Sequence, residues 1–194
     1  MRIALLIAAS LLALTFAACG GDDDNGGSGT PAAPGTPRPT ATPTVPPNLD
    51  EGATATLNGE PFVAVRTLPS ETYSTDELGQ AGVAADENGN RIPMATAPPG
   101  EVQAWEIISA APDGWRVWTP QVVLDIVEQA GAGSTVVSVE PTEWPDACLG
   151  AAAPDEVCAE IITPGYTIVV EGPADARSTY HADRSGNFRP APAS

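Results

Sequence analysis

The fold class depends most on residues 119–131, which read TPQVVLDIVEQAG. Thr119 is suited to cap a helix, Pro120 to its first position and Gly131 to its end, so one principal helix is expected over about 120–130. Its apolar residues recur at helical spacing, which indicates a helix buried against a sheet. They are Val123, Ile126, Val127 and Ala130 on one face, widened by Val122 and Leu124.

Three strand-like segments follow the helix within residues 119–190, at 135–140, 166–171 and 177–182. The order helix, strand, strand, strand predicts an α+β fold, a mainly antiparallel β-sheet with the helix packed on one face. Residues 183–187, DRSGN, are typical of the turn that follows the last strand.

Residues 48–118 are predicted to be the β-rich part of the fold. The strand-like segments 54–57 and 62–65 flank Asn58-Gly59, a pair that favours a tight hairpin because both residues tolerate positive φ. Residues 69–100 are rich in Pro, Gly and Asn, so we expect a long excursion with room for short strands.

A second hairpin is expected before the helix. Residues 102–109 predict a strand, and Pro112-Asp113-Gly114 predicts a turn into another strand at 115–118. This hairpin brings three tryptophans close together, namely Trp105, Trp115 and Trp118. They form either a ligand platform or the seal of a small core. The core is favoured, because indoles pack well across strands.

Residues 86–90, DENGN, place oxygen ligands at alternate positions, as the start of a calcium-binding loop does. However, Arg91 stands where such a loop requires glycine, and Ala97 stands where it requires a bidentate glutamate. A hairpin turn explains the same residues and is the favoured interpretation.

The first 18 residues are typical of a signal peptide. They carry one charge, Arg2, and an apolar run from Ile3 to Phe16 that is shorter than the ~20 residues of a membrane-spanning helix. The segment Phe16-Ala17-Ala18-Cys19 resembles the lipobox of bacterial lipoproteins, although that family usually has Leu in place of Phe16.

This resemblance implies that the leader, residues 1–18, is cut off and that the Cys19 thiol carries a diacylglycerol. Palmitate or similar chains would then hold the protein at the cell membrane, facing the extracytoplasmic side. The alternative is ordinary secretion, with cleavage after Ala17. Residues 19–47 are first Gly/Asp-rich and then Pro/Thr-rich, which predicts a disordered tether in front of a folded region at 48–194.

The charge of the chain excludes one class of partner. Its formal net charge is −17 at pH 7. Without the leader, seven arginines face 25 carboxylates and no lysine is present, which gives −18. Such a surface repels phosphate backbones, so no nucleic-acid binding is expected.

Cys148 and Cys158 are left as an even pair once Cys19 carries lipid, and an oxidising compartment predicts a disulfide between them. The segment 149–157 is expected to be irregular and exposed. A zinc site is the competing interpretation, but two cysteines and one distant histidine, His181, make a poor ligand set. No metal and no cofactor are predicted.

Three short motifs and one cysteine lie near the end of the chain. They are WPDACLG at 144–150, Cys158, TPGY at 163–166 and YHAD at 180–183. Together they resemble a small, largely uncharacterised domain of secreted and lipid-anchored bacterial proteins, and the resemblance covers about residues 120–189. It implies an extracytoplasmic α+β module with no assigned chemistry.

Five residues are the candidates for binding: Trp144, Asp146, Tyr166, Tyr180 and His181. On a strand, His181 and Asp183 would point to the same face, so that the carboxylate orients the imidazole. No Gly-x-Ser-x-Gly elbow and no Cys/His pair accompanies this histidine in the sequence, so no catalytic residue is assigned.

Three functions remain open. The first is a cell-surface lipoprotein with a small non-catalytic binding or inhibitor-like module, which presents the 148–158 loop to an envelope protein, a peptide or a wall glycan. The second is a structural or sensory envelope lipoprotein. The third is a hydrolase with His181 as general base. We rank them in this order.

Overall fold

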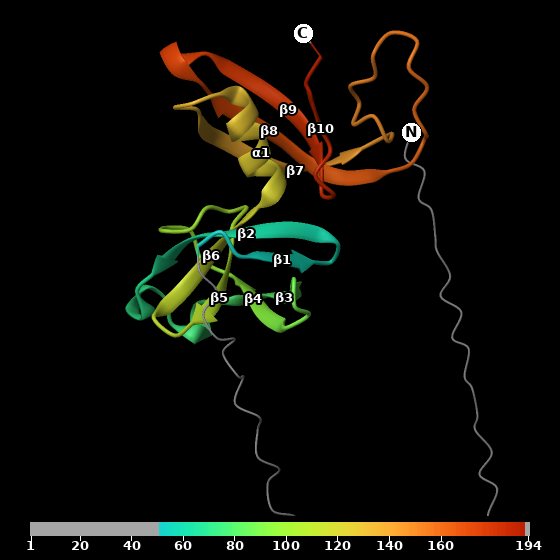
Figure 1. The fold of residues 1–194 in the computed structure, drawn as a ribbon. Coiled ribbons are helices and arrows are strands. Elements are labelled where there is room, and N and C mark those ends of the chain that lie inside the picture. Colours follow the sequence, from blue (N-terminus) through green and yellow to red (C-terminus); the bar gives the residue numbers. More distant parts are fainter. Residues whose placement is uncertain (1–50, 193–194) are drawn as a thin grey trace, which may run out of the picture. The chain divides into compact units, whose positions relative to one another are not determined.

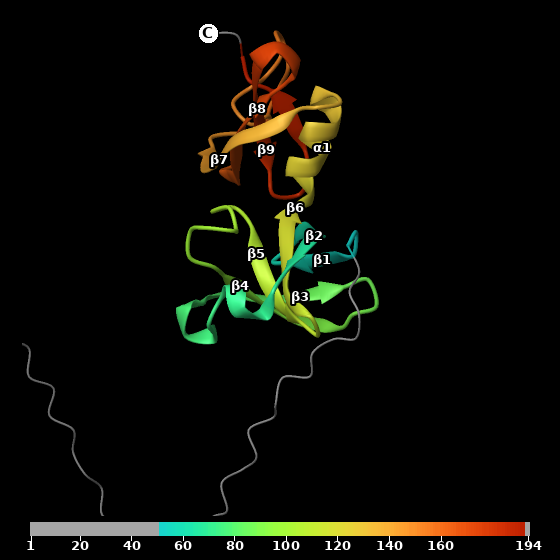
Figure 2. The ribbon, with the colours of Figure 1, turned by 90° about the vertical axis from the view of Figure 1, so that its left-hand side faces the viewer.

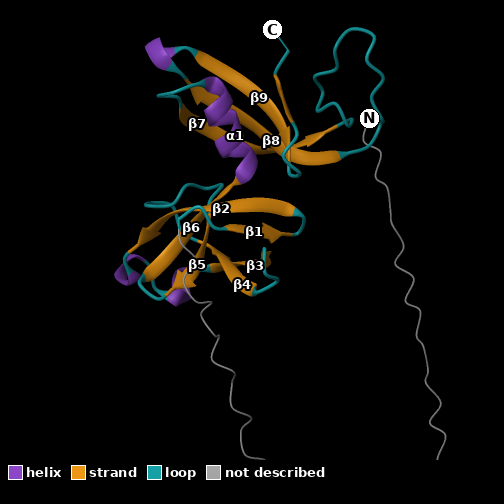
Figure 3. Ribbon diagram, viewed as in Figure 1, coloured by secondary structure: helices purple, strands orange, loops and turns teal. Residues whose placement is uncertain are grey.

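The computed structural model describes residues 51–192, which are mostly antiparallel strands with one α-helix (Figure 3). This architecture confirms the predicted α+β class. The predicted signal peptide (1–18) and the whole predicted tether (19–47), with Cys19, lie outside the described residues, which begin at residue 51. Within residues 51–192, no helix is both long and apolar enough to span a bilayer.

Six strands form a closed barrel in the order β1-β2-β6-β5-β4-β3. Their bounds are β1 (Thr54–Leu57), β2 (Glu60–Leu68), β3 (Gly79–Asp86), β4 (Arg91–Thr96), β5 (Ile107–Ala111) and β6 (Gly114–Pro120). The β1–β2 hairpin turns at Asn58 and Gly59, whose φ values of 53° and 86° confirm the predicted tight turn. Pairing of β1 with β3 closes the barrel.

The barrel interior is filled by nine buried apolar side chains, which come from all six strands. They are Ala55, Leu57, Phe62, Ala64, Ala84, Ile92, Met94, Ile107 and Trp118. Strand β6 is buried on both faces, because Val117 packs outside the barrel against Tyr73, Val102 and Ile108. Two short 3₁₀ helices, η1 (Ser70–Thr72) and η2 (Thr75–Glu77), lie in the segment between β2 and β3.

Two expectations for this part need correction. Residues 69–100 hold two full barrel strands, β3 and β4, which their small and polar residues concealed. The strand expected from Val102 begins only at Ile107, because Glu106 N donates to Gln103 O in a turn. The favoured hairpin turn at 86–90 is confirmed: Asp86 Oδ1 accepts hydrogen bonds from the amides of Asn88 and Asn90.

The sequence predicted that the three tryptophans lie close together. They lie instead in three separate apolar clusters. Trp118 is fully buried inside the barrel, Trp115 packs against the cluster outside β6, and Trp105 packs against the core of the second sheet. Successive side chains of a strand point to opposite faces, which separates Trp115 from Trp118. All three serve apolar packing, as the favoured interpretation had it.

The second sheet has four strands in the order β10-β9-β8-β7, with α1 (Gln121–Ala130) on one face (Figures 1 and 2). The strands are β7 (Thr135–Trp144), β8 (Thr163–Glu171), β9 (Arg177–Asp183) and β10 (Phe188–Pro190), with a 3₁₀ turn η3 (Pro173–Asp175) before β9. The short strand β10 was not predicted. The core between helix and sheet contains Val122, Val123 and Ile126 against Val139, Tyr166, Ile168, Val170, Tyr180 and Ala182.

The helix begins one residue later than predicted. Pro120 stands at the N-cap, and the Thr119 hydroxyl donates to Glu106 Oε1 instead of capping the helix. Thr119 still belongs to β6, where it is buried. The predicted end is confirmed, since Gly131 terminates α1 with a φ of 100°.

Candidate functional site

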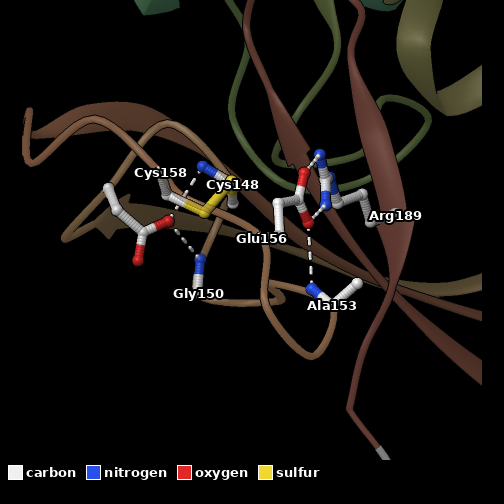
Figure 4. A network of polar contacts seen from close by, with 7 residues as sticks. Cys148, Gly150, Ala153, Glu156, Cys158 and Arg189 are labelled. Carbon is white, nitrogen blue, oxygen red and sulfur yellow. Dashed lines mark hydrogen bonds and ion pairs between the residues drawn. A yellow bond between two sulfur atoms is a disulfide. The ribbon is translucent and has the colours of Figure 1, made fainter.

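The segment between β7 and β8, residues 145–162, forms what we call the disulfide loop. Cys148 and Cys158 are joined by a disulfide with a Cα–Cα distance of 5.6 Å, as predicted. Asp146 Oδ1 accepts hydrogen bonds from the amides of Cys148 (2.8 Å) and Gly150 (3.1 Å), which fixes the start of the loop (Figure 4). Because both sulfurs are bonded to each other, they offer no thiolate to a metal beside Asp146.

An ion pair ties the middle of the disulfide loop to the edge strand β10. The Arg189 guanidinium donates to both oxygens of Glu156 at 2.6 and 2.7 Å, and the Ala153 amide also donates to this carboxylate (Figure 4). These hydrogen bonds, the one from Arg189 first, lower the pKa of Glu156 to about 2. The pair is therefore charged at neutral pH.

Trp144 and His181 lie together beneath the start of the loop. Their rings stack at 4.1 Å between centroids, and Trp144 Nε1 donates to the Ala182 carbonyl at 2.9 Å. His181 Nδ1 lies 2.8 Å from Leu149 O. A carbonyl only accepts hydrogen bonds, so Nδ1 carries the proton. The histidine therefore holds the loop on the sheet.

The expected orientation of His181 by Asp183 is wrong. Asp183 Oδ1 instead accepts from the amides of Ser185 and Asn187, and Oδ2 accepts from the Asn187 side chain, so the carboxylate caps the turn after β9. Short Asx-type bonds to the following backbone satisfy this group locally. The DRSGN segment is thus the turn that the sequence predicted.

Tyr166 and Tyr180 lie on the other face of the sheet, in the core beneath α1. Tyr166 OH donates to Glu60 Oε1 at 2.5 Å, and Tyr180 packs edge-on against Phe188. Burial first, and then this hydrogen bond, raises the pKa of Tyr166. Of the five candidate binding residues, the structure therefore brings Trp144, Asp146 and His181 together at the disulfide loop. It separates the two tyrosines from them, and a binding role for the five stays a prediction.

The disulfide loop exposes three large aliphatic side chains that the sequence reasoning missed. The exposed fractions are 96% for Val157, 57% for Ile161 and 68% for Ile162. An apolar pair such as Ile161-Ile162 is also typical of a buried strand, so the sequence pattern does not distinguish the two. Val157 ends the segment 149–157 that was expected to be irregular and exposed, but no such expectation covered Ile161 and Ile162, whose available signal was the Pro-Gly pair that follows them at 164–165.

Comparison with known proteins found a similarity for only one part of the chain. No match to a curated protein was found, and none to a solved structure. Residues 121–190 match the family described as a domain of unknown function (DUF8738). The match runs from α1 to β10 and includes the disulfide loop.

Proposed function

We propose that this protein is a bacterial cell-surface lipoprotein with a small non-catalytic binding module, whose disulfide loop binds another protein of the cell envelope. The observation that carries the proposal is the exposure of Val157, Ile161 and Ile162 on one short loop. Single exposed aliphatic residues are ordinary, but several gathered on one segment are typical of an interaction site.

The way the loop is held supports this role. It is fixed by the disulfide, by the Glu156–Arg189 ion pair and by the contact between Leu149 O and His181. A segment that is already ordered loses less conformational entropy on binding, so its apolar contacts translate into affinity more fully.

The loop favours a protein partner over a wall glycan. Trp144, the aromatic side chain nearest to the loop, is 92% buried beneath it and offers no free ring on which a sugar can stack. The exposed aliphatic residues are flanked by the carboxylates of Asp155 and Glu160, whereas Glu156 is already paired with Arg189. The complementary surface is therefore an apolar patch with a basic rim.

The proposal is tested with one triple variant and one double variant, both made in the full chain with Cys19→Ser to keep the protein soluble. Each protein is immobilised, partners are captured from the producer's envelope extract, and affinity is then measured with the purified partner. Complete burial of such a side chain contributes about 1.5–3 kcal/mol, so Val157→Ser/Ile161→Ser/Ile162→Ser is expected to weaken binding at least about 100-fold. The control Val83→Ser/Val137→Ser changes valines that are 46% and 41% exposed elsewhere and should bind normally. Equal affinity of both variants contradicts the proposal.

The lipid anchor is a separate part of the proposal and rests on the lipobox-like segment 16–19. When the producing bacterium is grown with radiolabelled palmitate, wild-type protein is expected to carry label and to sediment with membranes. The Cys19→Ser variant is expected to lose both properties, because two or more acyl chains are needed for firm attachment. Undiminished label in the variant would exclude Cys19 as the acceptor.

A further inference from the structure

Two tight hairpin turns bring opposite charges to one cavity, which no residue of the disulfide loop lines. The Asn58–Gly59 turn is followed directly by Glu60, and the turn at 183–187 carries Arg184. Both side chains line a cavity of about 400 Å³ between the barrel and the second sheet. Glu60 Oε2 and Arg184 Nε are 3.8 Å apart, too far for a hydrogen bond.

Glu60 is a buried carboxylate with one oxygen left open. The residue is 6% exposed, and its Oε1 accepts the hydrogen bond from Tyr166. Among residues 51–192, no hydrogen bond reaches Oε2. Burial raises the pKa of Glu60, although Tyr166 and Arg184 act in the opposite direction. Burying a carboxylate with incomplete partners costs stability, which is unusual unless the group has a use.

Glu106 lines the same cavity, but unlike Glu60 its carboxylate is fully hydrogen-bonded within the protein. Its two oxygens accept hydrogen bonds from the Arg66 guanidinium, the Gln103 amide and the Thr119 hydroxyl. Burial alone would raise the pKa of Glu106, but these partners together lower it. Glu106 is thus satisfied within the protein, whereas Glu60 presents an acceptor to the cavity.

Arg184 is the matching open group. Its side chain is 50% exposed, and its guanidinium lies over the Tyr166 ring at 5.8 Å from the centroid. Within the described residues its guanidinium makes no hydrogen bond, and the 3.8 Å approach to Glu60 is an ion pair only. A ligand that is only cationic is repelled by Arg184, and one that is only anionic is repelled by Glu60. A ligand with both charges side by side complements both groups.

The rest of the cavity wall is largely apolar and includes Leu57, Phe62, Ile107 and Val139. The volume lies in the range of small-molecule sites. In an α-amino acid a single carbon separates the ammonium from the carboxylate, and this carbon also carries the side chain. We propose that the cavity binds a free α-amino acid with an apolar side chain, its ammonium donating to Glu60 Oε2 and its carboxylate accepting from Arg184. This site is independent of the function proposed for the disulfide loop.

The experiment uses the full chain with Cys19→Ser and titrates it with L-leucine, L-valine and L-phenylalanine by calorimetry. At least one is expected to bind with a Kd of about 1 mM or lower. The N-acetyl and methyl-ester forms of that amino acid each lack one charge, and each should bind at least about tenfold more weakly. Absence of binding by all three amino acids overturns the proposal, as does equal binding of a blocked form.

Variants identify the two groups. Glu60→Gln and Arg184→Gln are each expected to weaken binding at least about tenfold. Two controls should not change it: Glu87→Gln, which alters the position equivalent to Arg184 in the turn at 86–90, and Arg177→Gln, an exposed arginine on β9. Normal binding by both cavity variants contradicts the assignment. The triple variant of the disulfide loop should retain amino-acid binding, so failure of one proposal is separable from failure of the other.

Stability distinguishes a binding role of Glu60 from a structural one. Because the folded-state pKa of Glu60 is raised, the native protein loses stability as pH rises from the ordinary carboxyl pKa through the raised value. Above that window the penalty is complete. Glu60→Gln removes it, so the variant is expected to unfold at the same or a higher temperature at pH 7 while losing the ligand. If this variant is instead destabilised, retained binding by Arg184→Gln overturns the proposal and lost binding supports it.

Discussion

Replacing Trp144 with Ala is expected to lower the free energy of unfolding by about 3–5 kcal/mol, the range for deleting a large buried aromatic side chain. The indole is 8% exposed, stacks on His181 and donates to the Ala182 carbonyl. Its removal leaves a cavity beneath the disulfide loop and a carbonyl without its donor. Urea denaturation followed by far-UV circular dichroism measures the change, with comparison of the denaturant slopes to check that the transition is unaltered.

Two further variants divide this effect into its parts. Trp144→Phe keeps an aromatic ring on His181 but removes the N–H donor, and it should cost about 1–3 kcal/mol. His181→Ala removes the other ring of the stack and the partner of Leu149 O, and it should loosen the loop so that a protease cleaves within 145–162 more readily. A Trp144→Ala variant within about 1 kcal/mol of wild type would contradict the packing role.

The structure gives the Trp-Pro-Asp motif a mechanical explanation. Trp144 anchors the end of β7, Pro145 leads the chain out of the strand, and Asp146 caps the turn that carries Cys148. These contacts hold the disulfide loop in one place on the sheet. The motif therefore specifies how the loop is held, and the residues that can meet a partner lie further along, at 157–162.

The features that the sequence predicted correctly are those encoded locally. The α1 helix, the Asn58–Gly59 hairpin and the turns at 86–90 and 183–187 each follow from a few adjacent residues whose φ preferences and short hydrogen bonds decide the conformation. The Cys148–Cys158 disulfide followed from parity in an oxidising compartment.

The features that were missed depend on pairing between distant segments. Strand β3 reads GQAGVAAD, which has little strand propensity, and it is held by pairing with both β1 and β4. Strand β10 has three residues and exists because it pairs with β9. The cavity at Glu60 and Arg184 joins residues more than 120 positions apart, and nothing local marks either of them. One repeat was visible in the sequence: DENGN and DRSGN share their first, fourth and fifth residues and form the same turn.

Replacing Gly165 with Ala is expected to cost at least about 3 kcal/mol, more than most overpacked sites, because the obstacle is backbone. A Cβ atom at this position would lie 1.9 Å from Ala182 O and 2.9 Å from Asp183 Cα, so β8 and β9 must separate. Gly79→Ala is the matched control, since it also changes a strand glycine but meets only the Thr96 hydroxyl, which can rotate away. Urea denaturation of both variants measures the difference, and equal stability contradicts the argument.

The two replacements are also expected to interact, because they act on one atom. Ala182 O is the acceptor of the Trp144 indole and also the atom that a side chain at 165 would strike. Displacing this carbonyl breaks the indole hydrogen bond, so part of the cost of Trp144→Ala is already incurred in Gly165→Ala. A double-mutant cycle should give a combined loss smaller than the sum by at least about 0.5 kcal/mol. The Trp-Pro-Asp and Pro-Gly-Tyr motifs then act together: Gly165 leaves space at Ala182 O, and this space allows the Trp144 indole to donate its hydrogen bond to that atom. Strict additivity would separate them.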